Sequence, residues 1–258
     1  NFDVQEKYLD YVLVPSGLLV LGIYHSWLLI AIRRHPTRFV IGLNRVSRHR
    51  WVYHMMSDPK NGILAIQTIR NNLMASTLLA TITITLSSLI SAVVSNSSSP
   101  TKPSLTGYIH TFKYFSILVC FLAAFLCNMQ CIRYYAHVSF LINAPPLGEG
   151  RDEYMEYVAQ KLDRGGLFWS LGLRAFYFSF PLLLWIFGAV AMFGCSCVMA
   201  VLLYFLDTAN SASRNLQNGA VHKEQAIRRD VEVGGESRGT TRSGDANLYS
   251  SLLESSKN

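Results

Sequence analysis

Six polar side chains lie within or beside long apolar stretches of the sequence, and they are the first candidates for chemistry. They are His25, Gln67, Arg70, Asn71, Asn128 and Arg133. If the apolar stretches cross a membrane, such groups are costly unless they are paired or hydrated. We expect these six residues to form one polar cluster that lines a vestibule in the cytoplasmic half of the membrane. The alternative is that His25 is a packed, hydrogen-bonded core residue and that Arg70 extends its side chain to the lipid headgroups.

Four hydroxyl side chains recur at helical spacing in the apolar stretch around residue 80. Thr77, Thr81, Thr85 and Ser88 follow one another at i+4, i+4 and i+3, so they share one face of a helix. Such a stripe could line an aqueous path. It could equally serve helix packing, because small polar side chains allow close approach and hydrogen bonds between membrane helices.

Recognisable catalytic and metal-binding motifs are missing from the sequence. It contains no GxSxG, P-loop or HExxH motif. The cysteines form no zinc-type CxxC pairing, and all of them lie in apolar stretches; they are Cys120, Cys127, Cys131, Cys195 and Cys197. We therefore expect no catalytic residue, no metal and no cofactor, and we interpret the chain as a protein that is not an enzyme.

The net charge of +7 is concentrated in residues 33–62, where seven basic residues face one acidic residue. Short loops that are rich in Lys and Arg stay on the cytoplasmic side of a membrane. We interpret the charge as a topology signal and expect no nucleic-acid partner. Within this segment, Arg45, Arg48, Arg50 and Trp51 are candidate contacts to anionic headgroups. The alternative is an ordinary cytoplasmic loop.

The elements that position these residues are predicted from the distribution of charge. Only 15% of the residues are charged, against about 25% in soluble domains. Residues 11–32, 73–95, 114–132 and 175–206 contain no Asp, Glu, Lys or Arg. About 20 apolar residues of helix cross a bilayer core. We predict an all-α, polytopic membrane protein with four transmembrane helices at about 11–32, 73–95, 114–132 and 181–206.

The remaining segments are assigned from capping residues and composition. Residues 152–164 begin with acidic and end with basic residues before Gly165–Gly166, a pattern typical of a short helix that ends at a glycine cap. We expect this short helix in the cytoplasm. Residues 208–258 are rich in Ser, Gly and charge, which predicts a disordered tail after a membrane domain at 1–207. Four crossings would place both termini on the non-cytoplasmic side of a plasma membrane or endomembrane.

Several separated motifs resemble a plant multi-pass membrane family catalogued as domain of unknown function 599. They are Tyr8-Leu-Asp-Tyr-Val-Leu-Val-Pro, the run from Leu64 to Ser76, Phe140-Leu-Ile-Asn-Ala-Pro-Pro and Pro181-Leu-Leu-Leu-Trp-Ile-Phe-Gly. The resemblance covers about residues 8–207. Gln67, Arg70, Asn71 and Met74 match the family's second-helix motif, and Pro145–Pro146 match its loop motif. The resemblance implies a multi-pass membrane protein from a plant and assigns no activity.

Two classes of function remain open from the sequence. The basic, aromatic segment around Trp51 favours a membrane scaffold, adaptor or transport-accessory protein that presents cytoplasmic segments to a protein partner. The hydroxyl stripe favours a small channel or transporter, which needs a homo-oligomer because four helices cannot easily enclose a pore. We prefer the scaffold, because each transport-like feature also has an explanation in helix packing.

Overall fold

The computed structural model describes residues 2–34, 39–97, 105–144, 150–208 and 219, with side chains omitted for 2–10, 97 and 105–110. The described part is all-helical apart from turns and one isolated bridge. Its elements are α1 (Phe2–Arg34), α2 (Val40–Ser57), the 3₁₀ turn η2 (Pro59–Asn61), α3 (Gly62–Ser97), α4 (Leu105–Leu141), α5 (Arg151–Leu184) and α6 (Ala189–Asp207). Five of them, α1 and α3 to α6, are long and apolar enough to cross a membrane. The expected disordered tail falls outside the described residues, except Thr208 and Gly219.

The uncharged run 175–206 does not form a single crossing, although one transmembrane helix is predicted there at about 181–206. Residues 11–32, 73–95 and 114–132 lie within α1, α3 and α4, but the fourth predicted segment is divided between α5 and α6. The backbone amides of Trp185, Ile186 and Phe187 still bond to carbonyls of the last turn of α5. Gly188 then has a φ of 147°, which an L side chain rarely adopts. The chain reverses there, so a run too long for one upright crossing becomes two arms of a hairpin.

The short helix expected at 152–164 is the first part of α5 and does not end at a glycine cap. Gly165 and Gly166 are buried in the middle of α5. A Cβ on Gly165 would lie 3.1 Å from Tyr135 of α4, and one on Gly166 would lie 2.7 Å from Cζ and Nη1 of Arg48 of α2. The glycines therefore allow two neighbouring helices to approach α5 closely, and packing outweighs their tendency to end a helix.

The basic segment expected as a loop contains an 18-residue helix, α2. Val52, Met55 and Met56 are buried on it. The turn after α2 follows from the sequence: Oδ1 of Asp58 accepts the backbone amide of Lys60 at 2.9 Å, and Pro59 occupies the first position of η2. Pro is favoured there because its missing N–H would have no helical partner.

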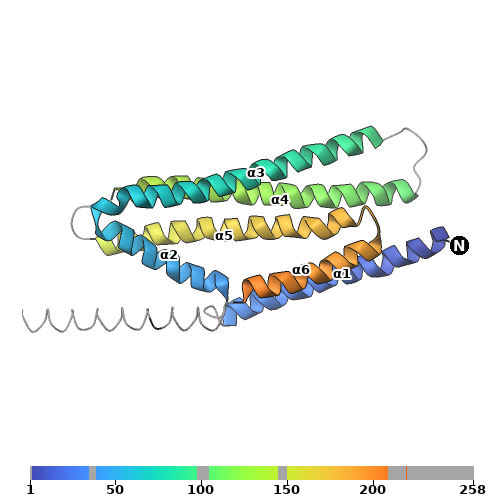
Figure 1. The fold of residues 1–258 in the computed structure, drawn as a ribbon, viewed down its shortest axis with the longest axis horizontal. Helices are drawn as coiled ribbons and strands as arrows, with labels where there is room; N and C mark the ends of the chain where they lie inside the picture. The colour runs from blue at the N-terminus through green and yellow to red at the C-terminus, as the bar shows by residue number, and fades with distance from the viewer. Residues whose placement is uncertain (1, 35–38, 98–104, 145–149, 209–218, 220–258) are drawn as a thin grey trace, which may run out of the picture. The chain divides into compact units, whose positions relative to one another are not determined.

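The three longest helices, α3, α4 and α5, run side by side (Figure 1). At one end α6 returns from the turn at Gly188 and packs along α1, while α2 covers α5 at the other end. Phe39, just before α2, forms an antiparallel bridge with Thr208, just after α6. The end of α6 therefore lies beside the end of α1 that leads into α2.

Two hydrophobic clusters divide the described helices along their length. One contains Val14, Ile117, Phe121, Trp185 and Met192 among its members, from α1, α4, the turn after α5, and α6. The other contains Val52, Ile69, Val138, Val158 and Leu162 among its members, from α2 to α5. The helices α3, α4 and α5 thus have a second core beyond the part that packs with α1 and α6.

Candidate functional site: a charged contact between three helices

An ion pair joins α5 to α6, and a tyrosine of α1 completes it. Nη2 of Arg174 donates to Oδ1 of Asp207 at 2.5 Å. The hydroxyl of Tyr24 donates to the other carboxylate oxygen at 2.6 Å. The side chains of Arg174 and Asp207 are only 15% and 12% exposed. Both oxygens of one buried carboxylate are therefore bonded, each by a different helix.

This contact lies where α6 ends. Asp207 is the last residue of α6, and the next residue, Thr208, forms the bridge to Phe39. Arg174 is about 16 Å along α5 from Trp185 at 1.5 Å per residue, so it reaches Asp207 from within an apolar part of α5. Both side chains are largely buried, and each charge needs a partner because desolvation is costly.

Arg174 also has hydrogen-bonding capacity that the ion pair does not use. Its Nη1 is buried and has no hydrogen-bond partner in the described part of the chain. Buried guanidinium groups normally have their donors satisfied. The arrangement can hold three helices together, and it also leaves one donor available to a further acceptor such as water or an anion.

Sequence reasoning missed this site although both charges were visible. Arg174 and Asp207 are the residues on either side of the uncharged run 175–206, so in the sequence they only limit that run. The chain reversal brings the boundaries together. Two signals were available: a run too long for one crossing, and a single charge of opposite sign at each end.

The six residues expected to form one polar cluster are not gathered by the fold. Asn128 is fully buried, with Nδ2 bonded to the carbonyl of Ala124 at 2.7 Å. His25 is on α1, where Nδ1 lies 2.8 Å from the carbonyl of Leu21, beside the rings of Tyr24 and Phe178. The remaining four are exposed on α3 and α4; they are Gln67, Arg70, Asn71 and Arg133. Periodicity alone could not show that the faces of α3 and α4 bearing these four residues point away from the other helices.

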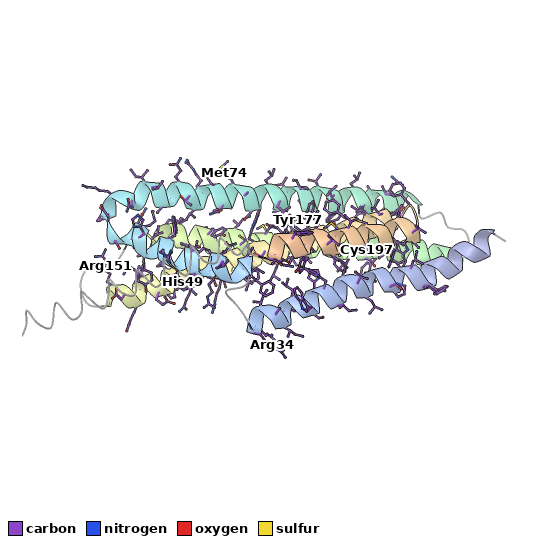
Figure 2. The ribbon with its side chains drawn as sticks, turned by 60° about the horizontal axis from the view of Figure 1, so that its bottom comes forward. Arg34, His49, Met74, Arg151, Tyr177 and Cys197 are labelled. Carbon is purple, nitrogen blue, oxygen red and sulfur yellow. The ribbon has the colours of Figure 1, made fainter. Side chains whose placement is uncertain are left out.

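The hydroxyl stripe of α3 faces away from the other helices. Thr77, Thr81, Thr85 and Ser88 are exposed, and each hydroxyl donates to the carbonyl four residues earlier at 2.8–3.0 Å. Met74 projects outward from the same helix (Figure 2). The buried hydroxyls of α3 belong to Ser76, Thr83 and Ser87 instead. The predicted stripe therefore neither packs within this chain nor lines a path inside it.

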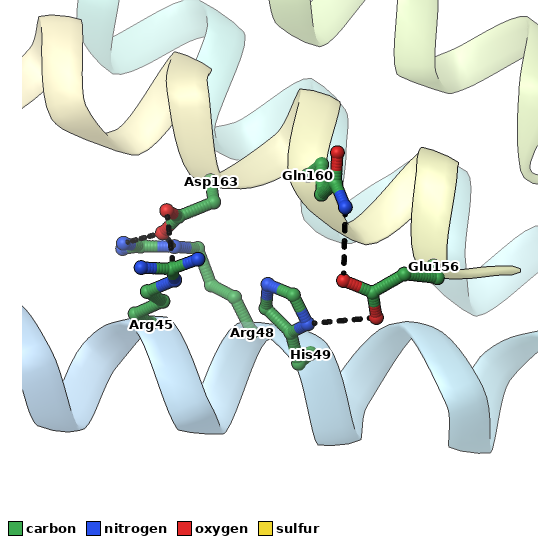
Figure 3. Close-up of polar contacts among 6 residues, drawn as sticks. All are labelled: Arg45, Arg48, His49, Glu156, Gln160 and Asp163. Carbon is green, nitrogen blue, oxygen red and sulfur yellow. Dashed lines mark hydrogen bonds and ion pairs between the residues drawn. The ribbon is translucent and has the colours of Figure 1, made fainter.

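A second charged contact fastens α2 to α5 (Figure 3). Nη2 of Arg48 lies 2.5 Å from Oδ1 of Asp163, and Nε of Arg45 lies 3.5 Å from Oδ2. His49 directly follows Arg48, and its Nδ1 lies 3.3 Å from Oε2 of Glu156. The other carboxylate oxygen of Glu156 accepts a hydrogen bond from Gln160. Two arginines thus share one carboxylate, which leaves a local excess of positive charge.

The four expected headgroup contacts differ in how they are placed. The Arg45 side chain is 64% exposed, whereas that of Arg48 is 24% exposed and is directed onto α5. Arg50 and Trp51 are partly buried, and Trp51 packs against the core beneath α2. Among the described residues, no three His, Cys, Asp or Glu side chains come together as a metal site.

Comparison with known proteins assigns the chain to a family. The model of the family described as "Protein of unknown function, DUF599" matches residues 12–212. The chain belongs to the DUF599 family. No curated protein and no solved structure matches it. The five long apolar helices indicate a membrane protein. The family description assigns it no activity.

We predict that the Arg174–Asp207 pair is coupled in stability. Arg174→Met or Asp207→Leu alone leaves an unpaired buried charge and should cost about 3–5 kcal/mol. The double variant should lose no more than either single variant, because no charge remains unpaired. Thermal unfolding of the DUF599 protein in detergent measures this cycle, with the exposed Arg133→Met as the control. If the stability loss of the double variant equals the sum of the losses of the two single variants, the two side chains do not depend on each other.

Proposed function

We propose that this DUF599 protein is a five-span membrane scaffold that presents a rigid helical platform on the cytoplasmic side of the bilayer. The platform consists of α2 and the adjoining ends of α3, α4 and α5. The observation that carries the proposal is the second hydrophobic core, which fastens α2 to the other three helices at that end. The platform binds protein partners, and the remaining helices anchor it.

Helix length supports a platform outside the bilayer. Helices α3, α4 and α5 have 36, 37 and 34 residues, which at 1.5 Å per residue gives lengths of about 50–55 Å. The hydrocarbon core of a bilayer is about 30 Å thick. Tilting takes up only part of the difference, so one end of each helix extends beyond the bilayer. The end with α2 fits, since it carries most of the charge.

The charged contacts between α2 and α5 support rigidity of the platform. Arg48 and His49 of α2 reach Asp163 and Glu156 of α5, and Nη2 of Arg151 donates to the carbonyl of Met56 at 2.6 Å. The first contacts hold the middle of α2, and the last holds its end. A surface held at several points loses little conformational entropy when a partner binds.

The position of basic residues supports a cytoplasmic platform and five crossings. Arg33 and Arg34 form the last turn of α1, and α2 adds Arg45, Arg48 and Arg50. Such clusters are retained in the cytoplasm. Since Thr208 bridges Phe39 at this end, α6 ends on the cytoplasmic side, whereas four crossings would end it on the opposite side.

Cysteine accessibility tests this topology. We predict that Lys60→Cys and Thr208→Cys are protected from an impermeant maleimide in intact cells and are labelled once the membrane is permeabilised. Ser95→Cys, at the other end of α3, should be labelled in intact cells. The background is the chain with its native cysteines replaced by alanine. Labelling of Thr208→Cys together with Ser95→Cys in intact cells would contradict five crossings.

Proximity labelling in cells tests the scaffold. His54→Glu with Lys60→Glu places two negative charges at exposed positions of the platform, and a mismatch of charge at the interface should weaken the binding of a partner at least about tenfold. We predict that the proteins labelled near the wild-type platform disappear in this variant. Thr81→Val with Thr85→Val, on the outward face of α3, is the control and should keep them. An unchanged set of neighbours in the charge-reversed variant would remove the support for a scaffold.

Transport is the second candidate function, and the charged contact at Arg174 favours it. Buried ionisable groups between membrane helices often belong to ion or proton pathways. A path in this protein would run between α1, α5 and α6, or along α3 at the centre of a homo-oligomer.

Flux through liposomes separates the two functions. For a scaffold we predict no flux of protons or small ions above that of empty liposomes. Flux that is lost in Asp207→Asn but not in Thr81→Val/Thr85→Val would place transport at the charged contact. The reverse result would place it along the hydroxyl stripe of α3, and either result would contradict a purely scaffolding role.

A further inference from the structure

A cavity of about 330 Å³ lies where α2, α3, α4 and α5 meet. Arg48, Asn44 and Trp51 line it from α2, Thr68 and Asn72 from α3, and Tyr135 from α4. Its volume is at the lower end of the range of about 300–1,000 Å³ typical of ligand sites. A small polar group of a larger molecule would fill it.

The cavity is at the level where the apolar part of the helices ends. Tyr135 lies two residues beyond Arg133, the first charged residue after the apolar stretch of α4. Thr68 and Asn72 lie on either side of Arg70, the last charged residue before the apolar stretch of α3. Lipid phosphates occupy this level of a bilayer, so a headgroup can enter the cavity while its acyl chains stay in the membrane.

The chemistry of the lining suits an anion that also carries hydroxyl groups. Arg48 supplies positive charge, and the side-chain amides of Asn44 and Asn72 each offer donors and an acceptor. Asp163 is the acidic group that faces Arg48, and Arg45 shares it. Glu156, the next acid along α5, lies beside His49 and Gln160 and does not line the cavity. Arg45 and Arg48 thus share the single carboxylate of Asp163, which leaves a positive charge beside the cavity.

Arg48 is held in place before any ligand arrives. Its guanidinium group bonds to Asp163 and lies against the backbone of Gly166, where a Cβ would be 2.7 Å from Cζ. A fixed arginine loses less entropy on binding a phosphate than a mobile one. Gly166 is buried because the guanidinium group of Arg48 packs against its backbone.

We propose that this cavity binds the headgroup of an inositol phospholipid. The phosphate lies against Arg48, and the ring hydroxyls bond to Asn44 and Asn72. A zwitterionic headgroup would bring its cation towards the same arginine, so it is disfavoured. Pockets of basic residues between membrane helices are known to accept such headgroups. The proposal rests on the level of the cavity at the bilayer surface and is independent of which side of the membrane α2 occupies.

Lipid retention by the full chain tests the proposal. The protein is reconstituted in nanodiscs of phosphatidylcholine that contain equal small amounts of phosphatidylinositol phosphate and phosphatidylserine with the same acyl chains. It is then extracted into detergent and purified, and the retained lipids are measured by mass spectrometry. Both faces of a nanodisc are accessible, so failure to bind the lipid leaves the proposed topology untouched, and a wrong topology leaves lipid binding measurable.

Three variants disrupt the site in different ways, and the first two have matched controls. Arg48→Gln removes the charge, and Arg70→Gln removes the same charge from an exposed residue of α3 outside the cavity. Gly166→Ala displaces the guanidinium group without changing the net charge, and Gly194→Ala adds a Cβ where nothing lies within 4 Å. Asn72→Leu removes an amide without touching the ion pair, and it decides the question if Arg48→Gln does not fold.

We expect the wild type to retain at least about ten times more inositol phospholipid than phosphatidylserine. A preference of this size corresponds to the contribution of one hydrogen bond to a charged group. Arg48→Gln, Gly166→Ala and Asn72→Leu should abolish that preference, while Arg70→Gln and Gly194→Ala keep it. Equal loss in Arg48→Gln and Arg70→Gln would show attraction by charge alone and overturn the proposal. Binding of soluble inositol phosphate as tightly as the lipid would also overturn it and assign the cavity to a soluble anion.

Discussion

Asp207 meets Arg174 because the chain reverses direction between Leu184 and Ala189. The positive φ of Gly188 permits that reversal, and the rest of the arrangement depends on it. Helix α6 can then run beside α1, and its end reaches the start of α2. The two side chains are largely buried, so neither charge is stable alone. The pair therefore requires the hairpin, and the hairpin requires a residue without a side chain at its turn.

The two ends of the long helices are stabilised by different physics. At the end with α1 and α6, many large apolar side chains are exposed, and the exposed hydroxyls of α3 bond to their own helix. At the end with α2, a compact core of Val, Ile, Leu and Met is flanked by the contacts of Arg48 with Asp163 and of His49 with Glu156. Helices α3, α4 and α5 contribute to both hydrophobic clusters and so join the two ends.

Glycines of α5 connect these features. Gly165 and Gly172 face α4, where a Cβ would lie 3.1 Å from Tyr135 and 2.6 Å from Asn128, and Gly166 faces Arg48 of α2. Small residues allow membrane helices to approach closely. The absence of a side chain at Gly166 also leaves room for the guanidinium group of Arg48, which lines the cavity. Gly165 and Gly166, which the sequence predicts as the end of a short helix, are thus positions of close packing.

The sequence by itself determined that the chain is all-helical, that it contains long apolar helices, and that basic residues are concentrated after the first of them. These properties follow from composition and from the local absence of charge. Only the tertiary structure decided that residues 175–206 form two helices, that Arg174 pairs with Asp207, and that the hydroxyl stripe of α3 faces outward. The physical reason is that a sequence shows a charged or hydroxyl side chain without showing which residue it contacts. Its partner depends on which helices pack antiparallel and on how each is rotated about its axis, and interactions between distant segments set both.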